Sequence, residues 1–158
     1  ISEQTDRHSA CHQARRDMGL RRKARELTLQ FFYGHDIQER PVAAEAELHE
    51  EVETFYSCFP TDQKARIYAE QLIKGICTRQ EEIDQALADC SHHWRVERMA
   101  LVDRNILRIA AYELLYSEDV PATVAINEAL EIAKRYAEPE SISFINGILD
   151  NLQGRKAG

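Results

Sequence analysis

Apolar residues recur at helical spacing along almost the whole chain, and no stretch of useful length alternates between apolar and polar residues. A strand with one buried face needs that alternation, whereas spacings of three and four residues place apolar side chains on one side of a helix. There is also no internal repeat and no linker long enough to divide the chain. The sequence therefore predicts an all-α fold of about seven helices, over residues 20–36, 42–56, 62–77, 78–90, 99–116, 122–136 and 141–152.

The two ends of this pattern differ in character. Residues 1–19 are polar and aperiodic, so we expect them to form a flexible N-terminal arm. Residues 20–158 then form a single all-helical domain. Its first helix carries an apolar stripe on one face, made by Leu20, Ala24, Leu27 and Phe31.

Two details place further helices inside the domain. Thr78 and Glu81 have the spacing of a capping box, which predicts that a new helix begins there. The stretch after Asn105 is apolar on nearly all sides, which predicts a buried central helix.

Composition narrows the class of protein. With 44% hydrophobic residues in 158, the chain can bury enough surface to fold, which excludes disordered and low-complexity proteins. No apolar run approaches the roughly 18 residues of a membrane span, and the first residues lack the pattern of a signal peptide. The cysteines are spaced neither as a Cys-x-x-Cys pair nor as a disulfide scaffold. We expect a cytoplasmic protein with no membrane contact and with reduced thiols at Cys11, Cys58, Cys77 and Cys90.

The net charge of −7 conceals an asymmetry. Residues 1–25 hold seven basic and three acidic side chains, a net charge of +4, so the remaining residues carry −11. A basic end on an acidic body predicts two surfaces with two kinds of partner. A solubilising tail is the alternative.

Motifs of enzymes are missing from the sequence. It contains no phosphate-binding loop, no dinucleotide-binding glycine motif and no nucleophile elbow. Asp89 and His92 form half of a di-iron motif, which requires a second half, and Cys90 with His92 lacks the further ligands of a zinc site. We therefore expect no enzyme activity, no metal and no cofactor.

Basic residues cluster at the start of the first predicted helix. At about 100° per residue, Arg21, Arg22 and Arg25 fall in one sector, away from the apolar stripe. The helix can then pack in the core and present three guanidinium groups to solvent, where they match RNA phosphates and stack on bases. The alternative is a solvated face that pairs with the acidic body.

Four blocks of sequence, in this order, resemble the NusB family of transcription antitermination factors. They are Arg21–Leu27 followed by Gln30–Tyr33, Leu107–Leu114, Val124–Lys134 and Phe144–Asp150. The resemblance implies an all-α fold of two small helical bundles packed together, without catalytic activity. It also implies binding of the single-stranded boxA element of nascent ribosomal RNA transcripts. The implied protein partners are NusE (a small-subunit ribosomal protein), NusA, NusG and RNA polymerase.

The resemblance also assigns residues. The implied RNA contacts lie at the basic motif and at the start of the last helix: Arg21, Arg22, Lys23, Arg25, Glu140, Ser141 and Phe144. The implied NusE surface is acidic and aromatic, and consists of Tyr33, Glu97 and Asp103.

Alternatives remain for several of these residues. Phe144 could pack in the core instead of stacking on a base, Tyr33 could be a half-buried helix residue, and Asp103 could cap the central helix. Ser143 stands where family members often carry a lysine. A protein-binding adapter, or an accessory domain of an rRNA-modifying enzyme with weak RNA binding, is the alternative function. A homodimer is a further expectation from the resemblance.

Overall fold

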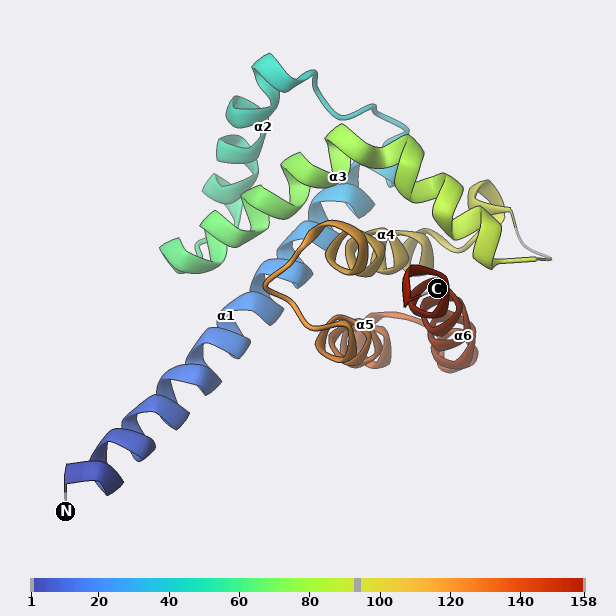
Figure 1. The fold of residues 1–158 in the computed structure, drawn as a ribbon. Helices are drawn as coiled ribbons and strands as arrows, with labels where there is room; N and C mark the ends of the chain where they lie inside the picture. Colours follow the sequence, from blue (N-terminus) through green and yellow to red (C-terminus); the bar gives the residue numbers. More distant parts are fainter. Residues whose placement is uncertain (1, 93–94, 158) are drawn as a thin grey trace.

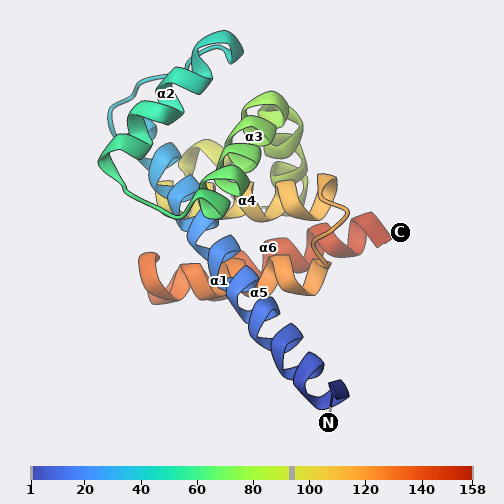
Figure 2. The same ribbon diagram turned by 90° about the vertical axis from the view of Figure 1, so that its left-hand side faces the viewer.

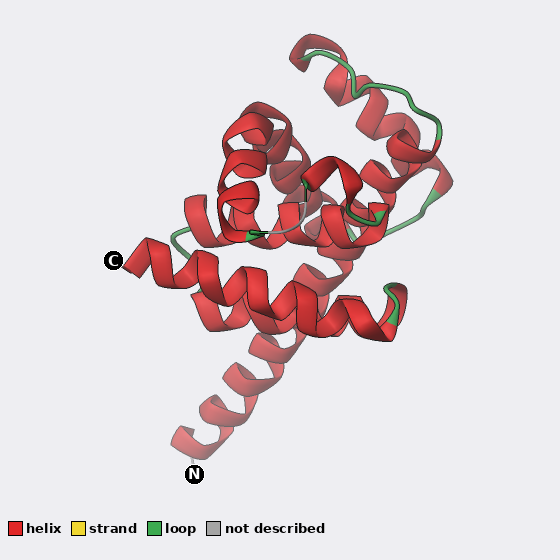
Figure 3. Ribbon diagram, turned by 90° about the vertical axis from the view of Figure 1, so that its right-hand side faces the viewer, coloured by secondary structure: helices red, strands yellow, loops and turns green. Residues whose placement is uncertain are grey.

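The structure is a computed structural model that describes residues 2–92 and 95–157, and these residues form six α-helices and one short 3-10 helix. The helices are α1 (Ser2–Ile37), α2 (Glu45–Cys58), α3 (Gln63–Cys90), η1 (Val96–Arg98), α4 (Leu101–Tyr116), α5 (Ala122–Tyr136) and α6 (Pro139–Ala157). Figure 3 shows the helices joined by short loops. The predicted all-α fold is confirmed.

The helices form two groups that share α4 as their common support. α1, α2 and α3 pack together in one group, and α4, α5 and α6 pack together in the other, while α1 and α3 both lie against α4 (Figure 2). Ten of the 16 residues of α4 are buried, as expected for the predicted central helix. This arrangement agrees with the two packed bundles that the family resemblance implies.

The segment predicted as a flexible arm continues α1. Residues 2–19 are helical, and Figure 1 shows this half of α1 extending away from the body. The predicted start of the first helix at Leu20 is therefore wrong. Periodicity detects only helices that bury one face, and the side chains of residues 9–19 are exposed. A helix already nucleated at Leu20 extends at little further cost. The flexibility of the arm stays a prediction.

α3 replaces two predicted helices. It runs from Gln63 to Cys90 with one non-helical residue, Arg79 (φ −119°, ψ 20°), which marks a kink. The predicted capping box is wrong, because the Thr78 hydroxyl donates to the Lys74 carbonyl (2.8 Å) instead of capping a new helix. Ile76 and Ile83, on either side of the kink, are both fully buried, so packing continues across it.

A glycine allows α3 and α4 to approach closely. Gly75 lies inside α3 against the ring of Tyr112 of α4, and a Cβ atom at this position would overlap that ring. Glycine is unfavourable inside a helix, so its presence here is explained by this contact between the two groups of helices.

Candidate nucleic-acid interface

The basic motif lies on α1 where the helix passes α3, α4 and α5. Arg25 is 2% exposed, and its Nε and Nη2 groups both donate to the carboxylate of Glu113 at 2.8 Å. The hydroxyl of Tyr68 on α3 donates to the same carboxylate. The expectation that Arg25 faces solvent is wrong. Its role in this structure is to join α1 to α4 through a buried ion pair.

Arg22 is held by a second acidic residue but stays accessible. Its Nε and Nη2 groups donate to Glu128 at 2.8 and 2.9 Å, and its side chain is 41% exposed. The Glu128 carboxylate is nearly buried and also lies 3.7 Å from Nη1 of Arg25. The hydrogen bond to Glu128 raises the pKa of Arg22 above its ordinary value. Glu128 therefore orients a charged guanidinium at the surface.

Arg21 lies at the edge of the same site. It donates to Asp119 at 2.7 Å, and its guanidinium lies 4.8 Å from the centre of the Tyr68 ring. The hydrogen bond from Arg21 lowers the pKa of Asp119. Lys23 is exposed, and within the described part of the chain it forms no ion pair. Arg21, Arg22 and Lys23 thus place three accessible cations on successive positions of α1, with the guanidinium of Arg21 over the ring of Tyr68. We call Arg21, Arg22, Lys23 and Tyr68 the basic surface.

Sequence reasoning missed the acidic residues beneath the arginines. Glu113 and Glu128 are 1% and 4% exposed, on α4 and α5. Glu113 lies in an otherwise apolar stretch, and a buried charge requires a partner. That requirement was a signal in the sequence for a buried cation. The sequence did not show which cation this is, because Arg25 lies 88 residues before Glu113.

The residues predicted at the start of the last helix meet one of the predicted NusE residues. Ser141 on α6 donates from its hydroxyl to Asp103 on α4 at 2.7 Å. Glu140, Ser141, Phe144 and Asp103 line one pocket of about 270 Å³, together with Arg98, Met99 and Ala100. The structure therefore joins residues from two surfaces that the resemblance implied separately.

Asp103 is neither an exposed charge nor a helix cap. It is 6% exposed, and the residue that caps α4 is Ala100, without a side-chain hydrogen bond. The expectation that Asp103 caps the helix is wrong, and its side chain lines the pocket as a nearly buried group. Its hydrogen bond to Ser141 instead connects the beginnings of α4 and α6.

Phe144 and the start of α6 differ in part from expectation. Phe144 is half-buried and packs against the hydrophobic core, so part of its ring remains at the surface of the pocket. The Ser141 N–H donates to the Glu138 carbonyl at 2.9 Å. At this position the backbone donor expected to meet phosphate is therefore already used.

The remaining predicted partner residues are exposed. Tyr33 lies on α1 with 39% of its surface accessible, and Glu97 is exposed on η1. Tyr33 follows Arg21 by three helical turns on the same helix, a separation of about 18 Å. The basic surface and Tyr33 can therefore contact different molecules.

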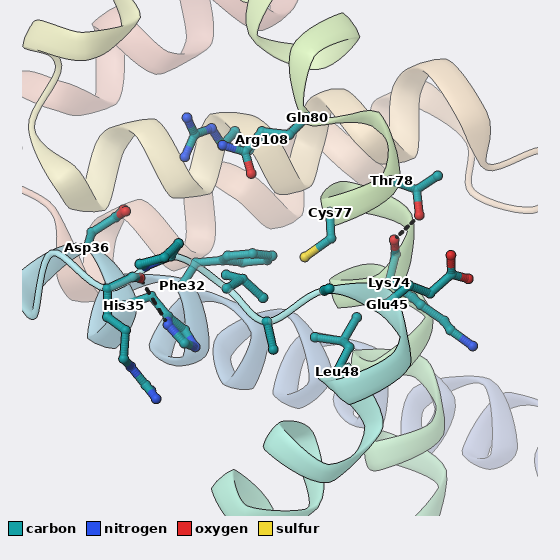
Figure 4. Close-up of a pocket in the computed structure, with 15 residues that line it drawn as sticks. Phe32, His35, Asp36, Glu45, Leu48, Lys74, Cys77, Thr78, Gln80 and Arg108 are labelled. Carbon is teal, nitrogen blue, oxygen red and sulfur yellow. Dashed lines mark hydrogen bonds between the residues drawn. The ribbon is translucent and has the colours of Figure 1, made fainter.

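A separate pocket of about 480 Å³ lies between the end of α1, the loop before α2 and α3 (Figure 4). It contains Cys77 and Arg108 but none of the predicted site residues. Burial raises the pKa of the Cys77 thiol to about 11, so the thiol stays protonated at neutral pH and is a poor nucleophile. Arg108 donates to both carboxylate oxygens of Asp84, at 2.7 and 2.8 Å. Neither Cys77 nor Arg108 is therefore a reactive group in this pocket.

Over residues 9–92 and 95–156, whose side chains the structure describes, no group of three or more His, Cys, Asp or Glu side chains is arranged to hold a metal ion. None of the helices in that same part of the chain combines the length and apolar character needed to cross a membrane.

Comparison with known sequences identifies similar proteins. The NusB family model matches residues 22–154. The chain is 45% identical over 136 residues to the transcription antitermination protein NusB of Trichlorobacter lovleyi, covering 86% of this chain and 92% of the relative. It is 43% identical over 135 residues to the protein of the same name from Geobacter sulfurreducens, covering 85% and 94%.

Solved structures have the same fold. The structure of T. maritima NusB superposes with a TM-score of 0.71 at 36% identity, covering 85% of this chain and 90% of that one. A NusB in a crystal structure with NusE and double-stranded RNA gives a TM-score of 0.72 at 24% identity, covering 87% and 98%.

Proposed function

Because this chain belongs to the NusB family of transcription antitermination proteins, we propose that it binds boxA-type single-stranded RNA in nascent ribosomal RNA transcripts. It does so together with NusE, and NusA, NusG and RNA polymerase complete the assembly. Termination is suppressed while this assembly remains on the transcript. This role places the protein in the cytoplasm, where transcripts are made.

The proposal of RNA binding rests mainly on the basic surface. Arg21, Arg22 and Lys23 are three accessible cations on α1, and the guanidinium of Arg21 lies over the ring of Tyr68, a combination that suits phosphates and stacked bases. The Arg21–Asp119 pair is exposed, and such pairs contribute little stability, so a phosphate displaces Asp119 at small cost. Glu128 engages Nε and Nη2 of Arg22, which leaves Nη1 for an RNA acceptor.

Arg25 acts on RNA only indirectly. Its guanidinium is enclosed with Glu113, and it contributes by fixing the position of α1. The pocket of Glu140, Ser141 and Phe144 is a second RNA contact, in which the accessible part of the Phe144 ring meets a base.

NusE binds at Tyr33 and Glu97. Both side chains are exposed, and an acidic group suits a basic ribosomal protein. A structural neighbour of this chain was solved as a complex of NusB with NusE and double-stranded RNA.

A second candidate function is a protein-binding adapter with weak RNA affinity. The observation in its favour is that Arg21, Arg22 and Arg25 are all paired with carboxylates of the same chain. RNA must compete with these carboxylates, and Ser143 supplies no compensating charge on α6.

A titration separates the two functions. We expect the chain to bind boxA-type single-stranded RNA more tightly than a scrambled RNA, with a further increase when NusE is present. Arg21→Ala with Lys23→Ala should lose about 1.5–3 kcal/mol for each charged hydrogen bond to phosphate, while the helical circular dichroism stays unchanged. Lys74→Ala with Arg95→Ala removes two exposed cations elsewhere and should have little effect. If the chain binds NusE but binds neither the boxA-type RNA nor the scrambled RNA, its function is that of the protein-binding adapter.

A further inference from the structure

The first half of α1 carries basic side chains that the family match does not include. The match begins at residue 22, whereas α1 begins at Ser2 and extends from the body (Figures 1 and 2). Arg15 and Arg16 lie on this extension and are exposed.

These arginines continue the line of Arg22 and Lys23 along one face of the helix, whereas Arg21 lies on another face. At about 100° per residue, Arg15, Arg16, Arg22 and Lys23 lie within a sector of about 120°. Asp17, the acidic residue between Ser9 and Lys23, lies outside this sector and accepts a hydrogen bond from Gln13 at 3.1 Å. We call Arg15, Arg16, Arg22 and Lys23 the basic stripe.

Arg15 and Arg16 differ from the arginines nearer the body in their partners. Arg21, Arg22 and Arg25 are paired with Asp119, Glu128 and Glu113. In the part of the structure with described side chains, residues 9–92 and 95–156, no carboxylate pairs with Arg15 or Arg16. Their charge is therefore not offset within the fold, although the rest of the chain beyond residue 25 carries −11.

The length of the stripe suits an extended polyanion. Arg15 and Lys23 are eight residues apart, about 12 Å along the helix axis at 1.5 Å per residue. Between Ser9 and Lys23 the face of the helix that carries the stripe has no carboxylate, so it presents this charge to a strand that runs alongside it.

We propose that the basic stripe is a further RNA contact, in which the single strand bound at Arg22 and Lys23 continues along α1 and its phosphates bind Arg15 and Arg16. This inference rests on the proposed function, since it requires the RNA to occupy the basic surface first. The chemistry recognised is the phosphate backbone, so the contact adds affinity without reading bases.

The test measures the salt dependence of RNA binding by the full chain. The probe is a boxA-type single-stranded RNA with several additional nucleotides at each end. Each phosphate contact on a single strand contributes about 0.7 to the slope of log K against log salt. Arg15→Ala with Arg16→Ala should therefore reduce the slope by about 1.4. Arg15→Lys with Arg16→Lys keeps both charges and should keep the slope.

Controls separate a specific contact from a general loss of charge. Lys74→Ala with Arg95→Ala removes the same net charge at exposed positions away from the stripe and should leave the slope unchanged. RNA without the additional nucleotides should bind the Arg15→Ala, Arg16→Ala variant as tightly as the parent.

Each outcome is decisive. If the Arg15→Ala, Arg16→Ala variant keeps the parental slope while Arg21→Ala with Lys23→Ala loses affinity, the stripe is overturned and the proposed function stands. If the parent itself shows no salt-dependent RNA binding, the proposed function fails. If the Arg15→Ala, Arg16→Ala variant alters self-association and leaves RNA binding unchanged, the stripe contacts an acidic surface of a second copy of this chain and the RNA proposal is wrong.

Discussion

Arg25 and Glu113 show how a charge in a basic motif can serve the fold. Both side chains are nearly inaccessible, at 3% and 1%, and the pair is bidentate. Burying two charges costs several kcal/mol, which the pair offsets only while both partners are present. The pair therefore fixes how α1 crosses α4 more than it adds to stability.

Replacing one partner of the Arg25–Glu113 pair should show how strongly the stability of the protein depends on both charges being present. We expect Arg25→Ala to destabilise the protein by about 3–5 kcal/mol, because Glu113 is left as an uncompensated buried charge. Arg25→Met combined with Glu113→Leu should recover most of the loss. Urea denaturation followed by circular dichroism measures both. If Arg25→Ala leaves the stability unchanged, Arg25 is not part of the framework and its assignment as an RNA contact is restored.

At the scale of elements, the contact between α3 and α4 depends on a missing side chain. Gly75 provides the space that the end of the Tyr112 ring occupies, and Tyr112 also packs on Tyr116 with ring centres 5.7 Å apart. An added methyl group must displace this ring. Gly75 therefore weakens α3 as an isolated helix but allows α3 and α4 to pack closely.

A pair of substitutions tests this link. Gly75→Ala should destabilise the parent, since overpacking costs about 1–3 kcal/mol and exceeds the helix propensity gained. In a Tyr112→Ala background the same change should stabilise by about 1 kcal/mol. Gly147→Ala is the matched control, because a Cβ atom there meets nothing within 4 Å, and it should stabilise in both backgrounds. Thermal melts give the signs. An equal effect of Gly75→Ala in both backgrounds would show that Tyr112 does not restrict the position.

At the scale of the whole molecule, the charge asymmetry separates two surfaces. The cations of the basic surface and of the stripe lie on the first part of α1, while Tyr33 lies toward its other end and Glu97 lies on η1. Charges at the edge of an interface act mainly on the rate of encounter. RNA and a basic protein can therefore be attracted to different parts of one small domain.

Reversal of one exposed charge should affect one partner. We expect Glu97→Lys to slow the association of NusE and to leave RNA affinity equal or slightly higher, because a negative charge has been removed from the field. Glu47→Lys on α2, also exposed, is the control of equal charge. Stopped-flow association at low salt and calorimetry with each partner measure the effects. NusE association that is equally fast with the parent and with Glu97→Lys would remove Glu97 from the partner surface.

The sequence by itself determined the all-α class, the buried central helix and the family, because periodicity and local motifs are properties of short segments. It did not determine which of the arginines are buried and which remain exposed. Helical spacing places Arg21, Arg22 and Arg25 in one sector, but the structure encloses Arg25 with Glu113 and leaves Arg22 partly exposed on Glu128. These partners come from α4 and α5, far along the chain, and depend on how the helices cross.

The same reason explains the other differences. Asp103 and Ser141 are 38 residues apart and meet only when α4 and α6 pack. The side chains of residues 9–19 in the helical extension are exposed, so no apolar pattern in the sequence indicates a helix there. Local sequence specifies which side of a helix is apolar, whereas the packing of the helices decides which charges are buried, paired or left for a partner.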